Sequence, residues 1–317
     1  MYMAQTLSNN VLEYKHISEA AKEIVTYIDN RRKGKVRSLR TKWLKFNKKC
    51  MGGIEPNTIY TIAGISGSGK SSFINSLETD LFDLNKDIEF VVLSFNWEML
   101  SSRQVGRKLS YRLEKTTSEL YSSSSRVSDE DYNNITKTAI ELSNYPIYYV
   151  DMPGTVQEVK NTILTFYSNP EIKGKWLITI LDHTLLTKGK GGDSEREILS
   201  DLQKMFMEIK KYGRNTIIQL SQMNRDIESS ERMVNPSMHF PMRKDVFGGD
   251  SLFQASDYVI VIHRPELLQL EMYGPKNWPV KDLIYMHFLK VREGEPGILV
   301  FKNNLKYNRI DDYKVDS

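Results

Sequence analysis

The chain has one cysteine, Cys50, in 317 residues, so no disulfide bond can form within it. This shortage fits a protein of a reducing compartment such as the cytoplasm. No apolar run approaches the roughly 20 residues that a membrane-spanning helix needs. The first ten residues lack the apolar stretch of a secretory signal peptide. We therefore expect a cytoplasmic protein that makes no contact with a membrane.

Acidic residues are absent from residues 31–49, a segment that holds ten Lys and Arg. The chain has a net charge of +4, yet outside this segment 34 basic side chains face 40 acidic ones. The basic character is therefore local. Such a run can bind nucleic acid, and it can equally be a solvated linker or a contact between subunits. We assign it to an N-terminal extension, residues 1–50, that precedes a main domain of residues 51–317.

A short amphipathic helix is expected upstream of the basic segment. Ser18 is suited to cap its N-terminus, and the apolar residues that follow the helical period are Ile17, Ala20, Ala21, Ile24 and Ile28. The extension has no globular segment of its own that could cover this face. The helix must therefore pack on the main domain or on another subunit.

Residues 64–71 read GISGSGKS, a complete phosphate-binding loop of the form GxxxxGK[ST]. Residues 58–63 resemble a strand and residues 71–84 a helix, which is the context that this motif requires and which disfavours a mere glycine turn. Glycines let backbone N–H groups close around phosphate oxygens at a helix N-terminus. Lys70 can reach the β- and γ-phosphates, and Ser71 can ligate Mg²⁺. The expected nucleotide-binding residues are Gly64, Ser66, Gly67, Ser68, Gly69, Lys70, Ser71 and Ser72.

Strand-like and helix-like segments alternate from about residue 52 onward. The expected strands are residues 59–63, 90–95, 147–150, 176–181, 216–220 and 258–262, with helices at 129–142, 156–167 and 194–212. Apolar strands separated by helices indicate an α/β fold whose parallel sheet is covered on both faces. Residues 285–291 and 298–302 are expected to form a final antiparallel pair.

Polar side chains at strand ends are candidates for catalysis. Asp182 ends an apolar strand and can orient Mg²⁺, although a carboxylate there is also a common cap. Glu98 follows another strand and can orient an attacking water, or it is a surface carboxylate at a helix start. Gln222 can sense the γ-phosphate, or it is a polar strand terminus. Lys290 and Arg292 share one side of a strand and either bind phosphate in trans or form a charged edge.

Two polar loops follow strands of the expected sheet. Residues 187–193 are glycine-rich and basic, and residues 226–250 are long and contain two prolines and two glycines. Both should lie at the carboxyl edge of the sheet, where open α/β sheets bind ligands. Each loop could also be a simple surface insertion.

Together these segments resemble the motor domain of DnaB-type replicative helicases over about residues 15–310. Besides the phosphate loop, the matching segments are SFNWEM (94–99), ILD (180–182), LSQMNR (220–225), GDSLFQASD (249–257) and KVREG (290–294). They occur in the order typical of the family. Two features depart from it. The family usually carries an N-terminal helical domain that forms a collar and engages primase, whereas here only about fifteen residues precede the expected helix. Either another chain supplies those contacts, or this is a compact form such as phages often encode. Residues 226–249 are also longer than usual.

The resemblance implies a RecA-like fold, a homohexameric ring, ATP and Mg²⁺ bound between subunits, and 5′→3′ movement on single-stranded DNA in a bacterial or phage-infected cell. Glu98 would be the catalytic glutamate, and Arg292 with Lys290 would complete the neighbour's site. The helix near residues 18–30 would dock on an adjacent subunit, and primase or a loader would be a partner. The expected DNA-binding residues are Lys188, Lys190, Arg243, Lys244, Gly248 and Gly249.

Two other readings of the same residues stay open. A recombinase or annealing ATPase of this fold would form filaments on single-stranded DNA instead of a closed ring. A loader or scaffold would bind ATP without hydrolysing it. The presence of Glu98, Asp182 and Arg292 argues against the second alternative, because a pure switch needs no group to position water.

Overall fold

The computed structural model describes residues 14–189, 191–235 and 238–313. The chain divides into two compact units after Ser38, and each is described by itself. In the first unit, helix α1 (Ile17–Arg32) has no buried residue and leaves Ile17, Ile24, Val25 and Ile28 exposed. Its N-cap is His16, whose ring accepts a hydrogen bond from the backbone N–H of Ser18. The prediction that Ser18 caps the helix is therefore wrong, since Ser18 already lies inside the first turn.

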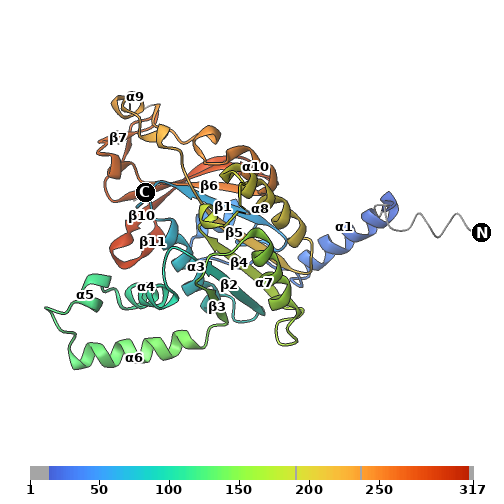
Figure 1. The fold of residues 1–317 in the computed structure, drawn as a ribbon, viewed down its shortest axis with the longest axis horizontal. Coiled ribbons are helices and arrows are strands. Elements are labelled where there is room, and N and C mark those ends of the chain that lie inside the picture. Colours follow the sequence, from blue (N-terminus) through green and yellow to red (C-terminus); the bar gives the residue numbers. More distant parts are fainter. Residues whose placement is uncertain (1–13, 190, 236–237, 314–317) are drawn as a thin grey trace, which may run out of the picture. The chain divides into compact units, whose positions relative to one another are not determined.

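The second unit is built on a nine-stranded sheet in the order β11-β10-β9-β6-β1-β5-β4-β2-β3 (Figure 1). The strands are β1 (Ile59–Gly64), β2 (Phe90–Asn96), β3 (Ile147–Val150), β4 (Trp176–Asp182), β5 (Asn215–Gln222), β6 (Tyr258–His263), β9 (Leu283–Val291), β10 (Gly297–Asn304) and β11 (Arg309–Asp312). The first six run parallel, and β9, β10 and β11 pair antiparallel. The predicted α/β class, strands and final antiparallel pair are confirmed; β11 and the small pair β7 (Met272–Tyr273) and β8 (Trp278–Pro279) were not predicted.

Helices cover both faces of this sheet, as the buried strands require. They are α2 (Leu44–Lys49), α3 (Lys70–Leu84), α4 (Ser101–Leu113), α5 (Thr117–Tyr121), α6 (Asp129–Ser143), α7 (Val156–Ser168), α8 (Glu195–Ile209), α9 (Ser230–Val234) and α10 (Gly249–Ala255). Because side chains alternate along a strand, Tyr60 and Ile62 of β1 face one core with α3, while Ile59 faces another with α7 and α8. Both faces of β1 are therefore packed in apolar cores. This packing holds the end of the strand in place and so fixes the position of the loop that follows it.

The compact second unit begins at Leu39, ahead of the boundary near residue 50 that the charge pattern suggested. Leu39 pairs with Ile54, and the Trp43 ring stacks on Phe73 of α3 at 4.8 Å between centroids. Phe46 of α2 is fully buried in the same core. The part of the basic segment from Leu39 onward is thus anchored in the second unit by apolar side chains at every few positions. It is not a solvated linker.

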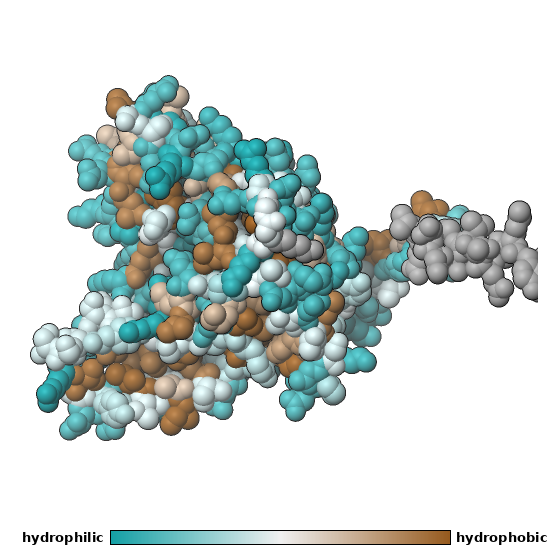
Figure 2. Space-filling model, viewed as in Figure 1, coloured by the Kyte–Doolittle hydropathy of each residue, from teal (hydrophilic) through white to brown (hydrophobic). Residues whose placement is uncertain are grey.

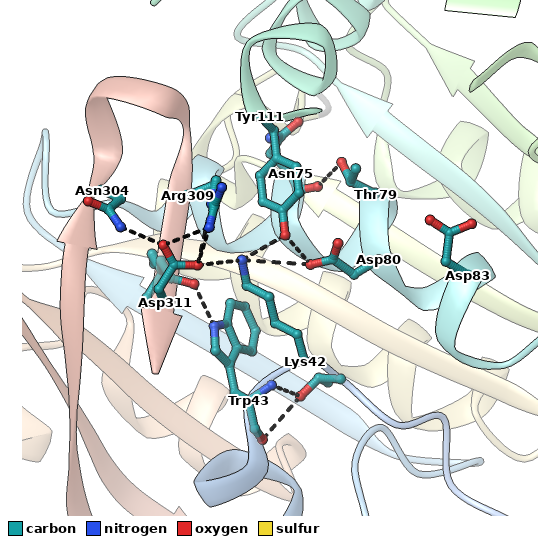
Figure 3. A network of polar contacts seen from close by, with 12 residues as sticks. Lys42, Trp43, Asn75, Thr79, Asp80, Asp83, Tyr111, Asn304, Arg309 and Asp311 are labelled. Atoms are coloured by element: carbon teal, nitrogen blue, oxygen red, sulfur yellow. Dashed lines mark hydrogen bonds and ion pairs between the residues drawn. The ribbon is translucent and has the colours of Figure 1, made fainter. Parts of the chain in front are cut away.

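The Lys42 side chain of that segment contacts the C-terminal strand β11 as well as α3 and α4 (Figure 3). The half-buried Lys42 ammonium lies 2.7 Å from the Tyr111 hydroxyl, 3.1 Å from Asp311 and 3.7 Å from Asp80. Burial lowers the pKa of Lys42, and the two carboxylates oppose that shift. Asp311 also pairs with Arg309. This network ties β11 to α3 and α4, so Lys42 stabilises the fold and its ammonium is not free to bind a partner.

Apolar side chains also reach the surface of the second unit. Figure 2 shows brown atoms over the region that holds α4, α5 and α6 in Figure 1. Exposed apolar residues of α5 and α6 are Tyr121, Tyr132 and Ile140. Within the described residues, no helix combines the length and apolar character that crossing a bilayer requires.

Candidate functional site

The phosphate loop connects β1 to α3 at the carboxyl edge of the parallel strands (Figure 1). Gly67 and Gly69 adopt φ values of +74° and +109°, which strongly favour glycine. At Gly64 the reason is close approach, since a Cβ atom would lie 2.3 Å from Ser68 Oγ and 2.6 Å from the carbonyl oxygen of Ile262. The loop is thus closed tightly enough for backbone N–H groups to surround a phosphate.

Lys70 is the first residue of α3, and its ammonium is held across the loop. Its Nζ donates to the carbonyl oxygens of Gly64 at 2.7 Å and Ile65 at 3.0 Å. Burial lowers the pKa of Lys70, while the charges of Asp182 and Glu98 act in the opposite direction. Both carboxylates therefore lie near the ammonium, as the sequence led us to expect.

The serines of the loop differ in environment. Ser66 is exposed and Ser71 is half-buried on the first turn of α3, whereas Ser72 is buried at 9% exposure. The Ser68 hydroxyl is fully buried and has no hydrogen-bond partner among the described residues. A polar atom in this position fits a site built for a polar ligand.

Asp182 is the last residue of β4, and Glu98 follows the end of the adjacent strand β2. Asn96 lies opposite Asp182 in the β2–β4 register, and the N–H of Trp97 donates to the Asp182 carbonyl at 3.0 Å. Burial raises the pKa of the Asp182 carboxyl to about 7, Glu98 adds to the rise, and Lys70 and Arg107 oppose it. Glu98 itself is exposed. The site therefore holds a buried carboxylate, Asp182, whose negative charge the nearby cations do not fully offset, and an exposed carboxylate, Glu98.

These residues fit a magnesium ion bound together with a nucleotide. Within the described residues, no three His, Cys, Asp or Glu side chains are arranged to hold a metal by themselves. Mg²⁺ in nucleotide sites needs only one or two protein ligands, with phosphates and water completing the octahedron. Asp182 and the Ser71 hydroxyl are the available oxygens. His183, joined to Asp182 by a cis peptide bond, is no substitute for a second acid, because burial and Lys70 lower its pKa.

Gln222 lies directly beside the phosphate loop. In the β1–β5 register it is the partner of Gly64, and its side chain is exposed. Its carbonyl oxygen accepts a hydrogen bond from the N–H of Phe247 at 3.0 Å, and Met223 pairs with Val246. The strand end beside the phosphate loop is thus hydrogen-bonded to the end of the long loop.

That long loop is held by a buried ion pair. Arg232 of α9 donates to the two carboxylate oxygens of Asp245 at 2.7 and 3.0 Å, and also to the carbonyl of Phe240 at 2.7 Å. Asp245 further accepts from the N–H of Met242 at 2.8 Å. Its side chain is fully buried and that of Arg232 is 8% exposed. The segment is therefore a packed substructure, although the sequence suggested only an irregular loop.

A cavity of about 610 Å³ opens beside this segment. Its cationic lining comes from Arg196 at the start of α8 and from Arg243 and Lys244, and Gly248 and Gly249 contribute backbone. Arg243 pairs with Asp250 at 3.0 Å in an exposed ion pair. Four of the six residues predicted to bind DNA thus gather at one cavity.

The two other residues predicted to bind DNA belong to the shorter loop. Lys188 is exposed, and its backbone N–H donates to the carbonyl of Gly154 at 2.9 Å. Lys190 lies outside the described residues.

Lys290 and Arg292 lie at the opposite, amino edge of the parallel strands. Lys290 is opposite Val259 at the start of β6, whereas Met286 is opposite Ile262, whose carbonyl approaches Gly64. The Lys290 ammonium donates to the carbonyl of Phe253, and burial together with Arg292 lowers its pKa. Arg292 pairs with Asp257 at 3.0 Å. The structure therefore brings Lys70, Glu98, Asp182 and Gln222 together and keeps this pair apart from them.

With this geometry in view, the comparison with known families is decisive. Residues 38–312 match the family described as the DnaB-like helicase C terminal domain. The chain belongs to the DnaB-like helicase C-terminal domain family. The family resemblance seen in the motifs is thereby confirmed.

Relatives of the DnaB-like family agree with this. The chain is 27% identical to "Replicative DNA helicase DnaB" of Mycobacterium leprae over an alignment of 207 residues. This alignment covers 62% of the chain and 32% of that protein. The chain therefore spans about a third of the length of this relative.

Solved structures show the same fold. One of them, a solved ATPase domain, has a TM-score of 0.79 at 19% identity, covering 95% of this chain and 100% of that one. "The Structure Of A DnaB-Like Replicative Helicase And Its Interactions With Primase" has a TM-score of 0.75 at 20% identity, covering 98% and 70%. The predicted RecA-like fold is confirmed by these likenesses.

Sequence reasoning missed some residues of this DnaB-like site. Arg107 of α4 places positive charge near Asp182, and Arg196 lines the basic cavity. Arg107 follows Glu98 by nine residues, so a helix predicted after Glu98 would have directed attention to it. Asp257 was seen only as the last letter of a motif, and nothing in the sequence reveals its contact with Arg292.

Proposed function

We propose that this chain is the ATP-driven motor unit of a replicative DNA helicase, which hydrolyses ATP, moves along single-stranded DNA and separates duplex. Membership of the DnaB-like helicase family supports this proposal, as do the relative named as a replicative DNA helicase and the fold shared with a solved ATPase domain. The motor unit corresponds to residues from Leu39 onward, and the segment before it to an N-terminal extension.

The observation on which the proposal depends is the separation of the two halves of the catalytic machinery. Along β9, Arg292 lies six residues beyond Met286, the residue level with the phosphate loop, which is on the order of 20 Å at roughly 3.3 Å per residue. No side chain spans that distance. A ring or chain of subunits can instead bring the Arg292 edge of one copy to the phosphate loop of the next, so the catalytic site is complete only between copies.

Each residue near the loop has a distinct role in this proposal. Residues 64 and 66–72 bind the phosphates, with Lys70 on the β- and γ-phosphates, while Ser71 and Asp182 ligate Mg²⁺. When bound, Mg²⁺ neutralises the phosphate charge that develops during transfer. Glu98 is exposed next to Lys70 and Asp182, where it can accept a proton from an attacking water. Arg292, with Lys290, stabilises the transition state in the neighbouring subunit.

Coupling to DNA follows from the contacts of Gln222. Its side chain can sense the γ-phosphate while its carbonyl holds Phe247, next to Gly248. A shift at Gln222 would therefore move the lining of the basic cavity. Arg243, Lys244, Gly248 and Gly249, with Lys188 and Lys190 on the shorter loop, bind backbone phosphates of single-stranded DNA.

The assembly we propose is a homohexamer that moves 5′→3′ in the cytoplasm of a bacterial or phage-infected cell. The exposed apolar face of α1 would be buried on an adjacent copy. Primase or a loader would be a further partner; one solved neighbour is described together with its interactions with primase.

Mixing two inactive variants tests the shared site. Lys70→Ala should lose nucleotide binding and Arg292→Ala should lose hydrolysis. Mixed particles should regain ATPase activity, because an intact Lys70 then meets an intact Arg292 at some interfaces. If mixing is verified by mass and no activity returns, the shared site is refuted.

A second experiment tests helicase activity itself. Forked DNA with a 5′ or 3′ tail should be unwound by the wild type on the 5′-tailed side, and not by Glu98→Gln. The exposed Glu130 of α6 provides a matched control, since Glu130→Gln should retain activity. Filaments instead of rings on single-stranded DNA would favour the recombinase alternative, and ATP binding without turnover would favour the loader.

A further inference from the structure

The Asp257 carboxylate lies at the amino edge of the sheet, just before β6, and binds two cations. Its Oδ1 lies 3.0 Å from Arg292 Nη1 in an ion pair and accepts a hydrogen bond from Lys210 Nζ at 3.2 Å. Its Oδ2 accepts from Lys210 Nζ at 2.8 Å and from the backbone N–H of Ile59 at 2.8 Å. The carbonyl of Asp257 also accepts from the N–H of Arg292 at 2.9 Å. One carboxylate thus organises the start of β1, the end of α8 and the turn after β9.

The two cations of this cluster are held unequally. The Lys210 side chain is 14% exposed and the Asp257 side chain 10%, whereas the Arg292 side chain is 47% exposed. Lys210 is the C-cap residue of α8 and touches both carboxylate oxygens. The cluster therefore contains a buried Lys–Asp pair and an arginine at its surface.

We propose that Asp257 holds Arg292 in a resting position within its own subunit, and that Lys210 determines how readily Arg292 leaves for the neighbour's nucleotide. This inference rests on the proposed role of Arg292. Asp257 and Lys210 are positioning residues, because they act through Arg292 and lie at the opposite edge from the phosphate loop of their own subunit.

The charge balance explains the role of Lys210. When Arg292 departs, a neutral Lys210–Asp257 pair remains, and the carboxylate keeps a hydrogen-bonded counter-charge. Without Lys210, departure of Arg292 would leave a largely buried carboxylate without an ionic partner, which is costly. The charge of Arg292 lowers the pKa of Lys290, so these two cations lie close enough to repel each other, which favours departure of Arg292. The charges of the cluster thus hold Arg292 in a defined position without binding it so tightly that it cannot leave.

The test begins with Lys210→Met, which removes the charge and keeps most of the volume. In the presence of single-stranded DNA, we expect kcat for ATP hydrolysis to fall about three- to tenfold with little change in KM, since the free energy at stake is that of a partly exposed pair. Lys210→Arg should retain kcat. The exposed neighbour Lys211 provides a matched control, and Lys211→Met should behave as the wild type.

A second substitution distinguishes release of Arg292 from a merely structural effect. Asp257→Asn in the Lys210→Met background removes the charge that traps Arg292, so kcat should recover. Asparagine can still accept from Ile59, and thermal melting verifies folding. Should the double variant not fold, the contrast between Lys210→Met and Lys210→Arg decides.

Two outcomes separate this inference from the proposed function. If Arg292→Ala is inactive but Lys210→Met has the kcat of the wild type, the resting position is refuted and the shared site stands. If Arg292→Ala hydrolyses ATP normally, the shared site itself is wrong. A drop in kcat that Asp257→Asn fails to reverse in a folded double variant also overturns the inference.

Discussion

Replacing Asp245 with asparagine is expected to open the long loop after β5 while leaving nucleotide binding intact. Asp245 is the fully buried acceptor for both Nη atoms of Arg232 and for the N–H of Met242. The substitution removes the charge but keeps the shape. The guanidinium of Arg232, 8% exposed, would then be buried without a counter-ion.

The size of the effect follows from that burial. Removing one partner of a buried ion pair costs roughly 3–5 kcal/mol, and the asparagine amide can recover part of this by accepting one hydrogen bond, so about 3 kcal/mol remains. The pair joins residues within a single loop. The cost should therefore appear as local opening, roughly a hundredfold in population, with a small change in the melting temperature of the whole unit.

Hydrogen exchange is the direct assay. The N–H groups of Asn224 and Phe247 donate to the carbonyls of Asp245 and Gln222, so both should exchange about a hundredfold faster in Asp245→Asn. Binding of single-stranded DNA should weaken, and nucleotide affinity should stay the same. Unchanged exchange at both amides would show that the ion pair does not hold the loop.

Asp250→Asn is the matched control in the same loop. Its ion pair with Arg243 is exposed, with side chains 88% and 58% accessible, so little stability should be lost. Because the change removes a negative charge from the basic cavity, DNA binding should strengthen slightly. The two asparagine variants thus predict opposite effects on DNA affinity, and equal weakening in both would contradict the reasoning.

Three further predictions concern the nucleotide site and the Lys42 network. The pKa of Asp182 is raised to about 7, so the metal-free folded state keeps a proton that the unfolded state releases near pH 4. The free energy of unfolding should therefore fall as pH rises from 4 towards 7, by up to about 1.4 kcal/mol per pH unit. Asp182→Asn should remove that slope in urea titrations. Gly64→Ala should abolish nucleotide binding, because its Cβ meets the Ile262 carbonyl at 2.6 Å, whereas Gly191→Ala, with nothing within 4 Å, should bind normally in calorimetry. Lys42→Met should lower the free energy of unfolding by about 2 kcal/mol, since it leaves partly buried carboxylates with less counter-charge; a value near zero would show that Tyr111 and Arg309 suffice.

Local patterns predicted much of the second unit. The phosphate loop and the parallel strands follow from glycine spacing and apolar runs, which are properties of neighbouring residues. Helix α4 received no predicted range, because its buried side chains include Gln104, Lys108 and Ser110 and it therefore lacks an apolar period. Its Gly106 also discourages a helix, yet a Cβ there would lie 1.6 Å from the Tyr121 hydroxyl. Tertiary packing explains both exceptions.

The candidate site required information that local sequence does not contain. Gln222 is a polar strand end in the sequence, and only the register with Gly64 places it beside the phosphate loop. The basic segment looked uniform, because ten charges obscured Leu39, Trp43 and Phe46, which the core buries. The contact between Arg292 and Asp257 depends on antiparallel pairing of β6 and β9, which the residues alone do not specify.

The seating of Trp43 has a mechanical consequence. Its indole stacks flat on Phe73, in the first turn of α3, and its Nε1 donates to the Ile310 carbonyl at 2.6 Å. The polypeptide runs without interruption from Ser38 into this anchor. If α1 docks on an adjacent copy as proposed, tension on the chain before Ser38 would act three residues from Lys70, the residue proposed to bind the β- and γ-phosphates.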